Sequence, residues 1–197
     1  AALQLIADLE PQMIDVGVVN DRPFINMVTG GFGTQVTVET SQELKKVLGG
    51  AAYFLTGLNR FSSISSQPGR FQGPDFEWQG NFMVLAIGNG RQAGGGHVMC
   101  PEASIDDGLL DVSILREPPN SEELPVVMNA LMEKGIEGVK EMAIVTAKVP
   151  WLELETDDAV YLNLDGEPEH GTHFRFQVLP GLLGLHLPVD SPVIKTR

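Results

Sequence analysis

The feature that most constrains the fold is a succession of short apolar segments interrupted every few residues by glycine, proline, asparagine or aspartate. The chain of 197 residues contains 22 glycines and 13 prolines, which is high for a helical protein. Such a pattern predicts many short strands joined by tight turns. The predicted fold class is mostly β, a β-sandwich with helical insertions.

The predicted strands are short and have turn residues at their ends. They are Met13–Val19, Phe24–Val28, Gly69–Gln72, Phe76–Gln79, Phe82–Ile87, Leu109–Leu115, Ala143–Val149, Trp151–Glu155, Ala159–Leu162, His173–Val178 and Leu182–His186. The glycines of Thr29–Gly33 are expected to break the pattern after the second strand. Helices are predicted at 41–48 and 51–61, and a third is predicted to open at Ser121.

Charge and cysteine usage exclude several classes of protein. The formal net charge of −13 repels phosphate backbones, so we expect no nucleic acid partner. Cys100 is the single cysteine, so no intrachain disulfide can form, and we expect it to be a core residue. No run of 18 apolar residues and no signal peptide is visible, and the expected location is cytoplasmic. The first residues look like a segment cut from a longer chain.

Two acidic turns are candidates for chemistry. In the first, Asp106 and Asp107 precede Gly108, and this oxygen-rich turn suits Mg²⁺, although it is equally typical of a turn that enters a strand. In the second, Asp165 and Glu167 flank a glycine after an apolar strand. A carboxylate there could accept a proton from a substrate hydroxyl, or the turn could simply close a hairpin.

Two glycine-rich loops, Thr29–Thr34 and Gly88–Gly96, match neither the P-loop nor the dinucleotide-binding pattern. Arg91 in the second loop is either a phosphate-binding cation or a solvated loop residue. The four histidines lack the spacing of a zinc site, and no serine-hydrolase elbow is present.

These segments occur together in an order that resembles the YegS-type bacterial lipid kinases of the diacylglycerol kinase and sphingosine kinase superfamily. The segments are Phe24–Thr34, Ile87–Gly96, Cys100–Leu110 and Asn163–Pro168, and the resemblance extends from about Ile14 to Leu187. It implies a two-domain enzyme with an N-terminal nucleotide-binding α/β domain that carries a Gly-Gly-Asp-Gly-Thr loop. No such motif occurs here, so residues 1–197 are expected to be the C-terminal β-sandwich domain alone, inactive without the other.

The resemblance also implies roles for particular residues. Glu167 would be the catalytic general base that deprotonates a lipid hydroxyl. Ser104, Asp107 and Leu109 would form a structural or regulatory Mg²⁺ site, with Leu109 contributing its backbone carbonyl. Asp106 and Asp165 lie beside these sites without an assigned role. ATP would be the co-substrate, bound mainly by the absent domain, and the partners would be a lipid substrate and the membrane periphery.

The leading functional hypothesis is therefore an ATP- and Mg²⁺-dependent lipid kinase acting on a glycerolipid hydroxyl. An NAD kinase relative, and a non-catalytic lipid- or carbohydrate-binding β-sandwich, remain as alternatives; a buried, salt-bridged Glu167 would favour the latter. Phe54, Leu58, Phe61 and Trp78 line either an acyl-chain cleft or the core. The helical insertion at Pro118–Glu141 is expected to form a surface or partner contact.

Overall fold

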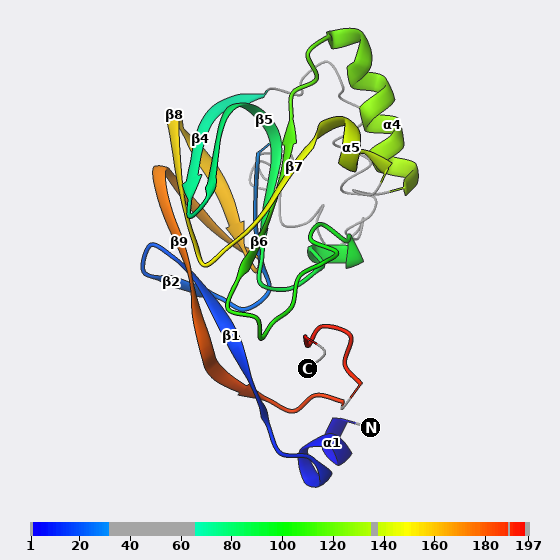
Figure 1. Cartoon of the computed structure of the whole chain (residues 1–197), viewed down its shortest axis with the longest axis vertical. Coiled ribbons are helices and arrows are strands. Elements are labelled where there is room, and N and C mark those ends of the chain that lie inside the picture. The colour runs from blue at the N-terminus through cyan, green and yellow to red at the C-terminus, as the bar shows by residue number, and fades with distance from the viewer. Residues whose placement is uncertain (1, 32–65, 135–137, 189, 196–197) are drawn as a thin grey trace, which may run out of the picture.

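The computed structural model describes residues 2–31, 66–134, 138–188 and 190–195, and strands dominate it (Figure 1). The strands are β1 (Gln12–Val19), β2 (Arg22–Phe24), β3 (Met27–Gly31), β4 (Gln67–Gly73), β5 (Phe76–Gly88), β6 (Leu110–Arg116), β7 (Ile144–Val149), β8 (Trp151–Leu164) and β9 (Glu167–Leu185). The helices are α1 (Ala2–Asp8), α4 (Leu124–Lys134) and α5 (Lys140–Ala143), with 3-10 turns η2 (Gly94–Gly96) and η3 (Ser121–Glu123).

All the strands join one antiparallel sheet in the order β2-β1-β9-β8-β3-β5-β6-β7, and β4 also pairs with β5 and β8. Strands β3 and β4 lie end to end between β5 and β8. Gly31 at the end of β3 faces Val84, and Gln67 at the start of β4 faces Phe82 on the same neighbouring strand. Two strands that are separate in the sequence thus share one position in the sheet.

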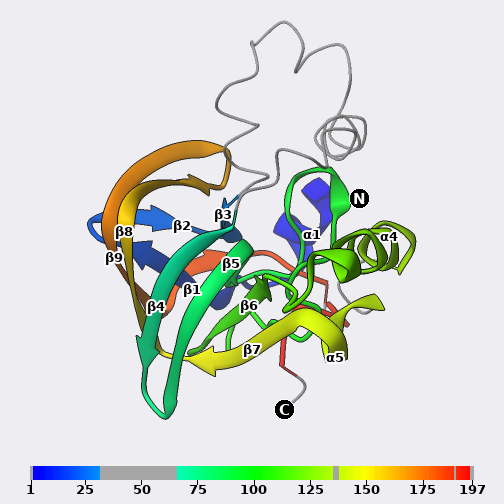
Figure 2. The ribbon, with the colours of Figure 1, turned by 90° about the horizontal axis from the view of Figure 1, so that it is seen from above.

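The sheet curls around a single large apolar core, as the view from above shows (Figure 2). Alternating residues of β8 and β9, such as Leu152, Leu154, Phe174 and Phe176, are at most 1% exposed and face this core. The period of two is what a strand with one buried face requires. Burial of these side chains supplies most of the driving force for folding.

The other face of β5 and β6 is covered by helices and loops. Val127 of α4 and Ala143 at the end of α5 pack with Met83 and Leu115 in a second apolar cluster. Cys100, Ala103 and Ala86 form a third, under the loop that precedes β6. None of the helices in the described ranges is both long and apolar enough to cross a bilayer.

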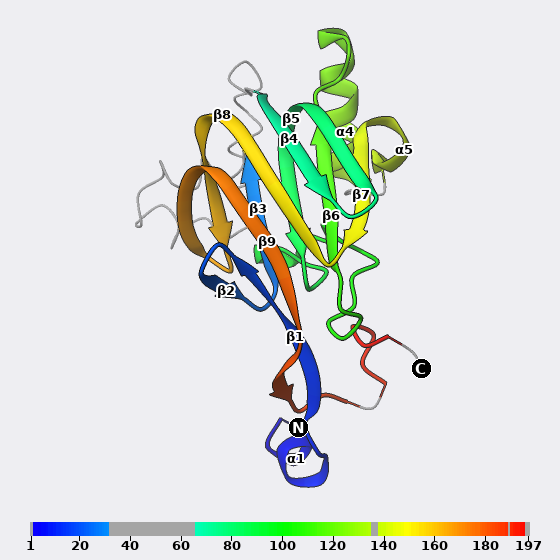
Figure 3. The ribbon, with the colours of Figure 1, turned by 60° about the vertical axis from the view of Figure 1, so that its left-hand side comes forward.

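Strands β1 and β9 continue beyond the sheet as a two-stranded ribbon that leads to α1 (Figures 1 and 3). The pairing of Ile14 with Leu183 is followed by that of Val16 with Leu179, so one residue of β1 lies opposite three of β9. A bulge of this kind bends a strand and increases its twist. The ribbon therefore changes direction at residue 15.

The predicted β-sandwich class with helical insertions is confirmed, but several local predictions were wrong. Residues Thr29–Gly31 continue β3, because Gly30 leaves room for the Leu162 side chain, which lies 2.6 Å from where a Cβ would be. Three pairs of strands that were predicted as separate are single long strands. Phe76–Gln79 and Phe82–Ile87 belong to β5, the two segments within 151–162 belong to β8, and those within 173–186 belong to β9. The third helix does open at Ser121, where η3 leads into α4, and the Asn120 side chain ahead of it accepts the Glu122 N–H. The helices predicted at 41–48 and 51–61, with Phe54, Leu58 and Phe61, lie outside the described residues.

We predict that Gly17→Ala destabilises the domain by about 1–3 kcal/mol, because the new methyl group would overlap the buried ring of Phe24. Urea unfolding of the chain measures the change. Gly94→Ala is the matched control, since nothing lies within 4 Å of its added Cβ. Equal unfolding midpoints for the two variants would contradict this packing argument.

Candidate active site

Glu167 stands directly after the tight turn that joins β8 to β9. Asp165 and Gly166 form the turn with φ angles of 48° and 106°, the left-handed pair of a two-residue hairpin that Asp-Gly favours. The Asn163 side chain accepts the Gly166 N–H at 2.7 Å. Glu167 is paired with Leu164 in the sheet, so its backbone is fixed while its side chain is exposed.

The Asp165 carboxylate fastens this turn to the segment between β2 and β3. Its oxygens accept the main-chain N–H groups of Ile25 at 2.6 Å, Asn26 at 3.1 Å and Met27 at 2.8 Å. The Asp165 N–H in turn donates to the Met27 carbonyl at 3.1 Å. These bonds explain why the predicted strand Phe24–Val28 is interrupted: the N–H groups at its centre bind the Asp165 carboxylate instead of a neighbouring strand.

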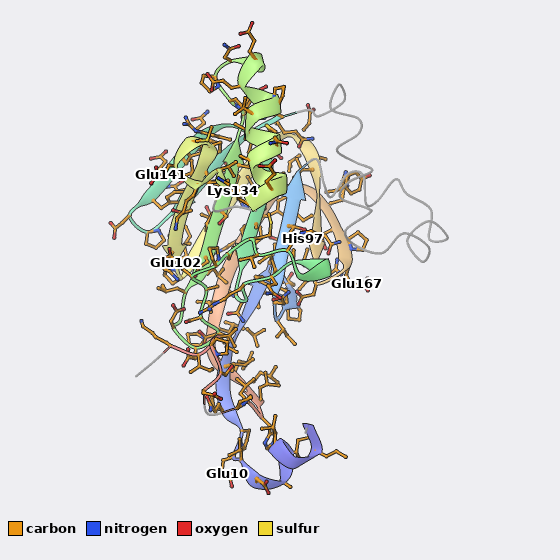
Figure 4. The ribbon with its side chains drawn as sticks, turned by 90° about the vertical axis from the view of Figure 1, so that its right-hand side faces the viewer. Glu10, His97, Glu102, Lys134, Glu141 and Glu167 are labelled. Carbon is orange, nitrogen blue, oxygen red and sulfur yellow. The ribbon has the colours of Figure 1, made fainter. Side chains whose placement is uncertain are left out.

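The same segment carries the glycine-rich loop after β5. The Asn26 carbonyl accepts the N–H groups of Asn89 and Gly90, and its side-chain amide donates to the Gln92 carbonyl at 2.7 Å. A side chain at Gly90 would collide with Asn26 Oδ1. The segment Ile25–Met27 thus links the turn of Glu167 to the glycine-rich loop. Figure 4 labels Glu167 and His97, the residue that follows this loop, in the same half of the view.

The two glutamates at the start of β9 have different environments. Glu169 accepts a hydrogen bond from Arg22, which also donates to the Pro168 carbonyl. Within the described ranges, the Glu167 carboxylate has neither a hydrogen bond nor an ion pair. Among the carboxylates of this hairpin, Glu167 is therefore the one that no described residue occupies.

Arg91 supports the glycine-rich loop from within. Its Nε donates to the Ala103 carbonyl at 2.7 Å, and its own carbonyl accepts the N–H groups of Met99 and Cys100. The side chain is half-buried rather than solvated as a free loop residue would be. Arg91 thus links the glycine-rich loop to the loop that contains the predicted metal ligands.

Ser104, Asp107 and Leu109 lie in that second loop, just before β6. Asp107 Oδ1 accepts the Leu109 N–H at 3.1 Å, while Ser104 is buried. The adjacent Asp106 is engaged elsewhere, since it accepts the Lys195 N–H at 2.7 Å. One partly exposed carboxylate with neighbouring loop carbonyls fits Mg²⁺, which usually keeps several waters and takes one or two protein carboxylates. The described residues hold no group of three His, Cys, Asp or Glu side chains suited to a metal.

Two buried polar residues were missed by the sequence analysis. Asp15 is 2% exposed and Asn89 is fully buried. The Asn89 side chain donates to the carbonyls of Asp15 and Ile25, so it ties β1 to the Asp165-bound segment. A lone aspartate inside the apolar segment Met13–Val19 was the signal that could have revealed this junction, because a buried charge requires partners.

A separate cavity of about 190 Å³ lies over the outer face of β6 and β7. Lys148 donates to Asp111 at 2.8 Å, and Lys140 donates to Glu102 at 2.9 Å at the same cavity. Burial raises the pKa of Asp111 despite Lys148, whereas the hydrogen bond from Lys140 lowers the pKa of Glu102. The lining charges are balanced, so this cavity does not favour either an anion or a cation.

The chain matches the family model described as YegS C-terminal NAD kinase beta sandwich-like domain over residues 26–187. A curated relative from Pseudomonas aeruginosa (strain UCBPP-PA14), described as a probable lipid kinase YegS-like, is 54% identical over 99% of this chain and 63% of its own length. Another from Pseudomonas syringae pv. syringae, with the same description, is 52% identical over 98% of this chain and 61% of its own.

Solved structures show the same fold. A putative diacylglycerol kinase from Bacillus anthracis str. Sterne superposes with a TM-score of 0.77 at 21% identity, covering 97% of this chain and 61% of that one. The fold is thus that of the diacylglycerol kinase-like β-sandwich domain. More narrowly, the chain belongs to the YegS-type lipid kinase family, as its C-terminal domain. It spans about 63% of the length of the first of these curated relatives.

We predict that Asp165→Asn destabilises the domain by about 1–3 kcal/mol, because charge-assisted bonds to the three N–H groups weaken while the left-handed turn stays accessible to asparagine. Urea unfolding measures the effect. Asp75→Asn is the matched control: Asp75 also has a positive φ of 54° in a hairpin turn, and its carboxylate accepts no bond within the described ranges. An equal effect at both positions would contradict the role given to Asp165.

Cys100 should resist alkylation in the native protein. Burial raises the pKa of its thiol from 9.0 to about 12, and the thiolate is the reactive form. Because the unfolded thiol ionises first, this group costs no stability below pH 9.0 and lowers stability as the pH rises from there toward about 12. Iodoacetamide labelling with and without urea, followed by mass spectrometry, tests this. Native labelling at the unfolded rate would contradict it.

Proposed function

We propose that the protein containing this domain is an ATP- and Mg²⁺-dependent lipid kinase that phosphorylates a hydroxyl group of a glycerolipid. The family and the descriptions of the curated relatives support a lipid kinase. The observation that carries the proposal for this chain is the exposed carboxylate of Glu167, which follows a turn held by hydrogen bonds to the segment between β2 and β3 and to the Asn163 side chain.

In this proposal Glu167 is the general base. It accepts the proton of the lipid hydroxyl as that oxygen attacks the γ-phosphorus of ATP, and the bond to the bridging oxygen breaks to release ADP. Positioning is the main contribution that a protein makes to phosphoryl transfer. Asp165 and Asn163 would contribute to positioning here, because they fix the backbone of the turn and leave only the Glu167 side chain to be oriented.

Asp107 would hold Mg²⁺ together with the carbonyls of Ser104 and Leu109, and the cation would supply local structure or regulation at this loop. Among the described residues, neither of those two carbonyls accepts a hydrogen bond from the protein. Both are therefore available as oxygen ligands, and water would complete the coordination shell.

The nucleotide would be delivered by a second, α/β domain corresponding to the part of the relatives that this chain does not span. The region proposed to contact that domain is α1 with the projecting ribbon, which carries exposed large apolar side chains. They are Leu3, Ile6, Met13, Leu182 and Leu185, whose exposed fractions range from 39% to 83%. In the register of the ribbon Met13 and Leu185 lie on opposite faces, so exposed apolar side chains occur on both of its sides. Exposed apolar area of this kind is typical of a surface that another domain covers.

The alternatives are less well supported. A non-catalytic binding domain would be favoured by a buried, salt-bridged Glu167, and the side chain is instead exposed. An NAD kinase is not what the relatives are described as. The single buried cysteine supports the further proposal of a cytoplasmic location, where the lipid would be reached at the membrane periphery.

We predict that Glu167→Gln in the complete protein lowers the turnover number for lipid phosphorylation by about 10²–10⁴-fold, because the amide cannot accept the hydroxyl proton. The measurement is transfer of radiolabelled phosphate from ATP to a panel of lipids, including diacylglycerol and phosphatidylglycerol.

Glu169→Gln is the matched control, since this glutamate lies two residues along the same strand and is bound to Arg22. Its variant should keep most of the activity. Unchanged turnover in Glu167→Gln would remove Glu167 from the mechanism, and absence of phosphate transfer to any lipid by the wild-type protein would refute the kinase proposal.

A further inference from the structure

Asp15 is the most deeply buried carboxylate in the described part of the chain, and the proposed mechanism does not use it. Only 2% of its surface is exposed. Its Oδ2 accepts the Gly108 N–H at 2.7 Å, and its Oδ1 accepts the Gly181 N–H at 2.8 Å. Charge-assisted bonds to both oxygens offset the cost of burying this group.

The two residues that donate to Asp15 have similar conformations. Gly108 and Gly181 are both left-handed, with φ angles of 72° and 59°. Glycine is the residue that adopts this region without strain, so both turns are shaped to direct an N–H at the carboxylate. The turns also approach each other, since a Cβ on Gly108 would lie 3.9 Å from the Pro180 ring.

The main chain of Asp15 makes two more connections. Its N–H donates to the Ile105 carbonyl at 2.7 Å, and its carbonyl accepts the Asn89 side-chain N–H at 3.0 Å. One residue thus contacts the 104–109 loop twice, β9 once and the glycine-rich loop once. We call these four hydrogen bonds the Asp15 junction.

The junction lies between the predicted cation ligands and the bend in the ribbon. Asp107 and Leu109 flank Gly108 on either side, and the Asp107 carboxylate closes over it to bind the Leu109 N–H. Gly181 lies in the bulge of β9 opposite Asp15, where the ribbon changes direction. The Asp15 carboxylate binds the N–H of Gly108 and the N–H of Gly181 in β9. A cation that restricts the peptides around Gly108 would therefore also restrict the carboxylate that holds β9.

We propose that Asp15 is a positioning residue that couples divalent-cation binding at the 104–109 loop to the stiffness of the β1–β9 ribbon. The inference rests on the cation site of the proposed function. Energetic coupling between two sites is reciprocal, so an intact junction should also raise the affinity of the loop for the cation. Because the ribbon carries exposed apolar side chains, a bound cation would orient the region that the second domain is proposed to contact.

Hydrogen exchange of the whole chain, followed by mass spectrometry with and without Mg²⁺ at matched ionic strength, tests the coupling. In the wild-type chain Mg²⁺ should slow exchange severalfold in the peptide that contains Gly181. In Asp15→Asn this protection should be lost, and calorimetric Mg²⁺ affinity should fall by about ten- to a hundredfold, as it does when partners of metal ligands are removed. Asp107→Asn should abolish both Mg²⁺ binding and the protection.

Asp106→Asn is the matched control, because it makes the same charge change in the same loop but its carboxylate binds Lys195 rather than β9. Saturating Mg²⁺ should still protect the Gly181 peptide in this variant. If Asp15→Asn does not fold, the comparison of the wild-type chain with Asp107→Asn decides the question.

Three outcomes would overturn the proposal: an absence of Mg²⁺ binding by the wild-type chain, Mg²⁺ protection confined to the 104–109 loop, or full protection of the Gly181 peptide in a folded Asp15→Asn variant. The test is independent of catalysis. Protection at Gly181 in a protein that phosphorylates no lipid would support the coupling and refute the kinase.

Discussion

Aspartate carboxylates that accept main-chain N–H groups hold together the loops on which the candidate site depends. Asp165 binds three consecutive peptides between β2 and β3, and Asp15 binds one peptide in each of two turns that are far apart in the sequence. Such bonds are stronger than those between neutral groups, and each satisfies a donor that no strand partner reaches. The loops of this domain are thus organised by a few negative charges rather than by regular secondary structure.

This arrangement explains how a single hairpin can present a reactive group. The turn of Asp165 and Gly166 is rigid because its backbone is bonded on both sides, and Glu167 inherits that rigidity through its pairing with Leu164. Glu169, two residues later, forms an ion pair with Arg22. Asp165 and Glu169 are thus bonded within the protein, whereas Glu167 between them remains exposed to solvent.

The sequence predicted the features that depend on local pattern and not those that depend on remote partners. The alternation along β8 and β9 and the Asp-Gly turn are local, and the resemblance to a family supplied the roles of Glu167, Asp107, Ser104 and Leu109, which stay predictions. The continuation of β3 through Gly30 depends on the Leu162 side chain, more than a hundred residues away. Asp15 looked like an interruption of an apolar strand because its partners come from two other turns.

The end-to-end placement of β3 and β4 has a consequence for how substitutions can perturb the sheet. Both half-strands occupy one position between β5 and β8, but each makes its own set of backbone pairs with these two neighbours. A substitution that weakens the pairing of β3 therefore leaves the pairs of β4 in place, and the reverse also holds. The position of Glu167 depends on the β3 half, because Val28 pairs with Leu164 at the end of β8 that leads into its turn.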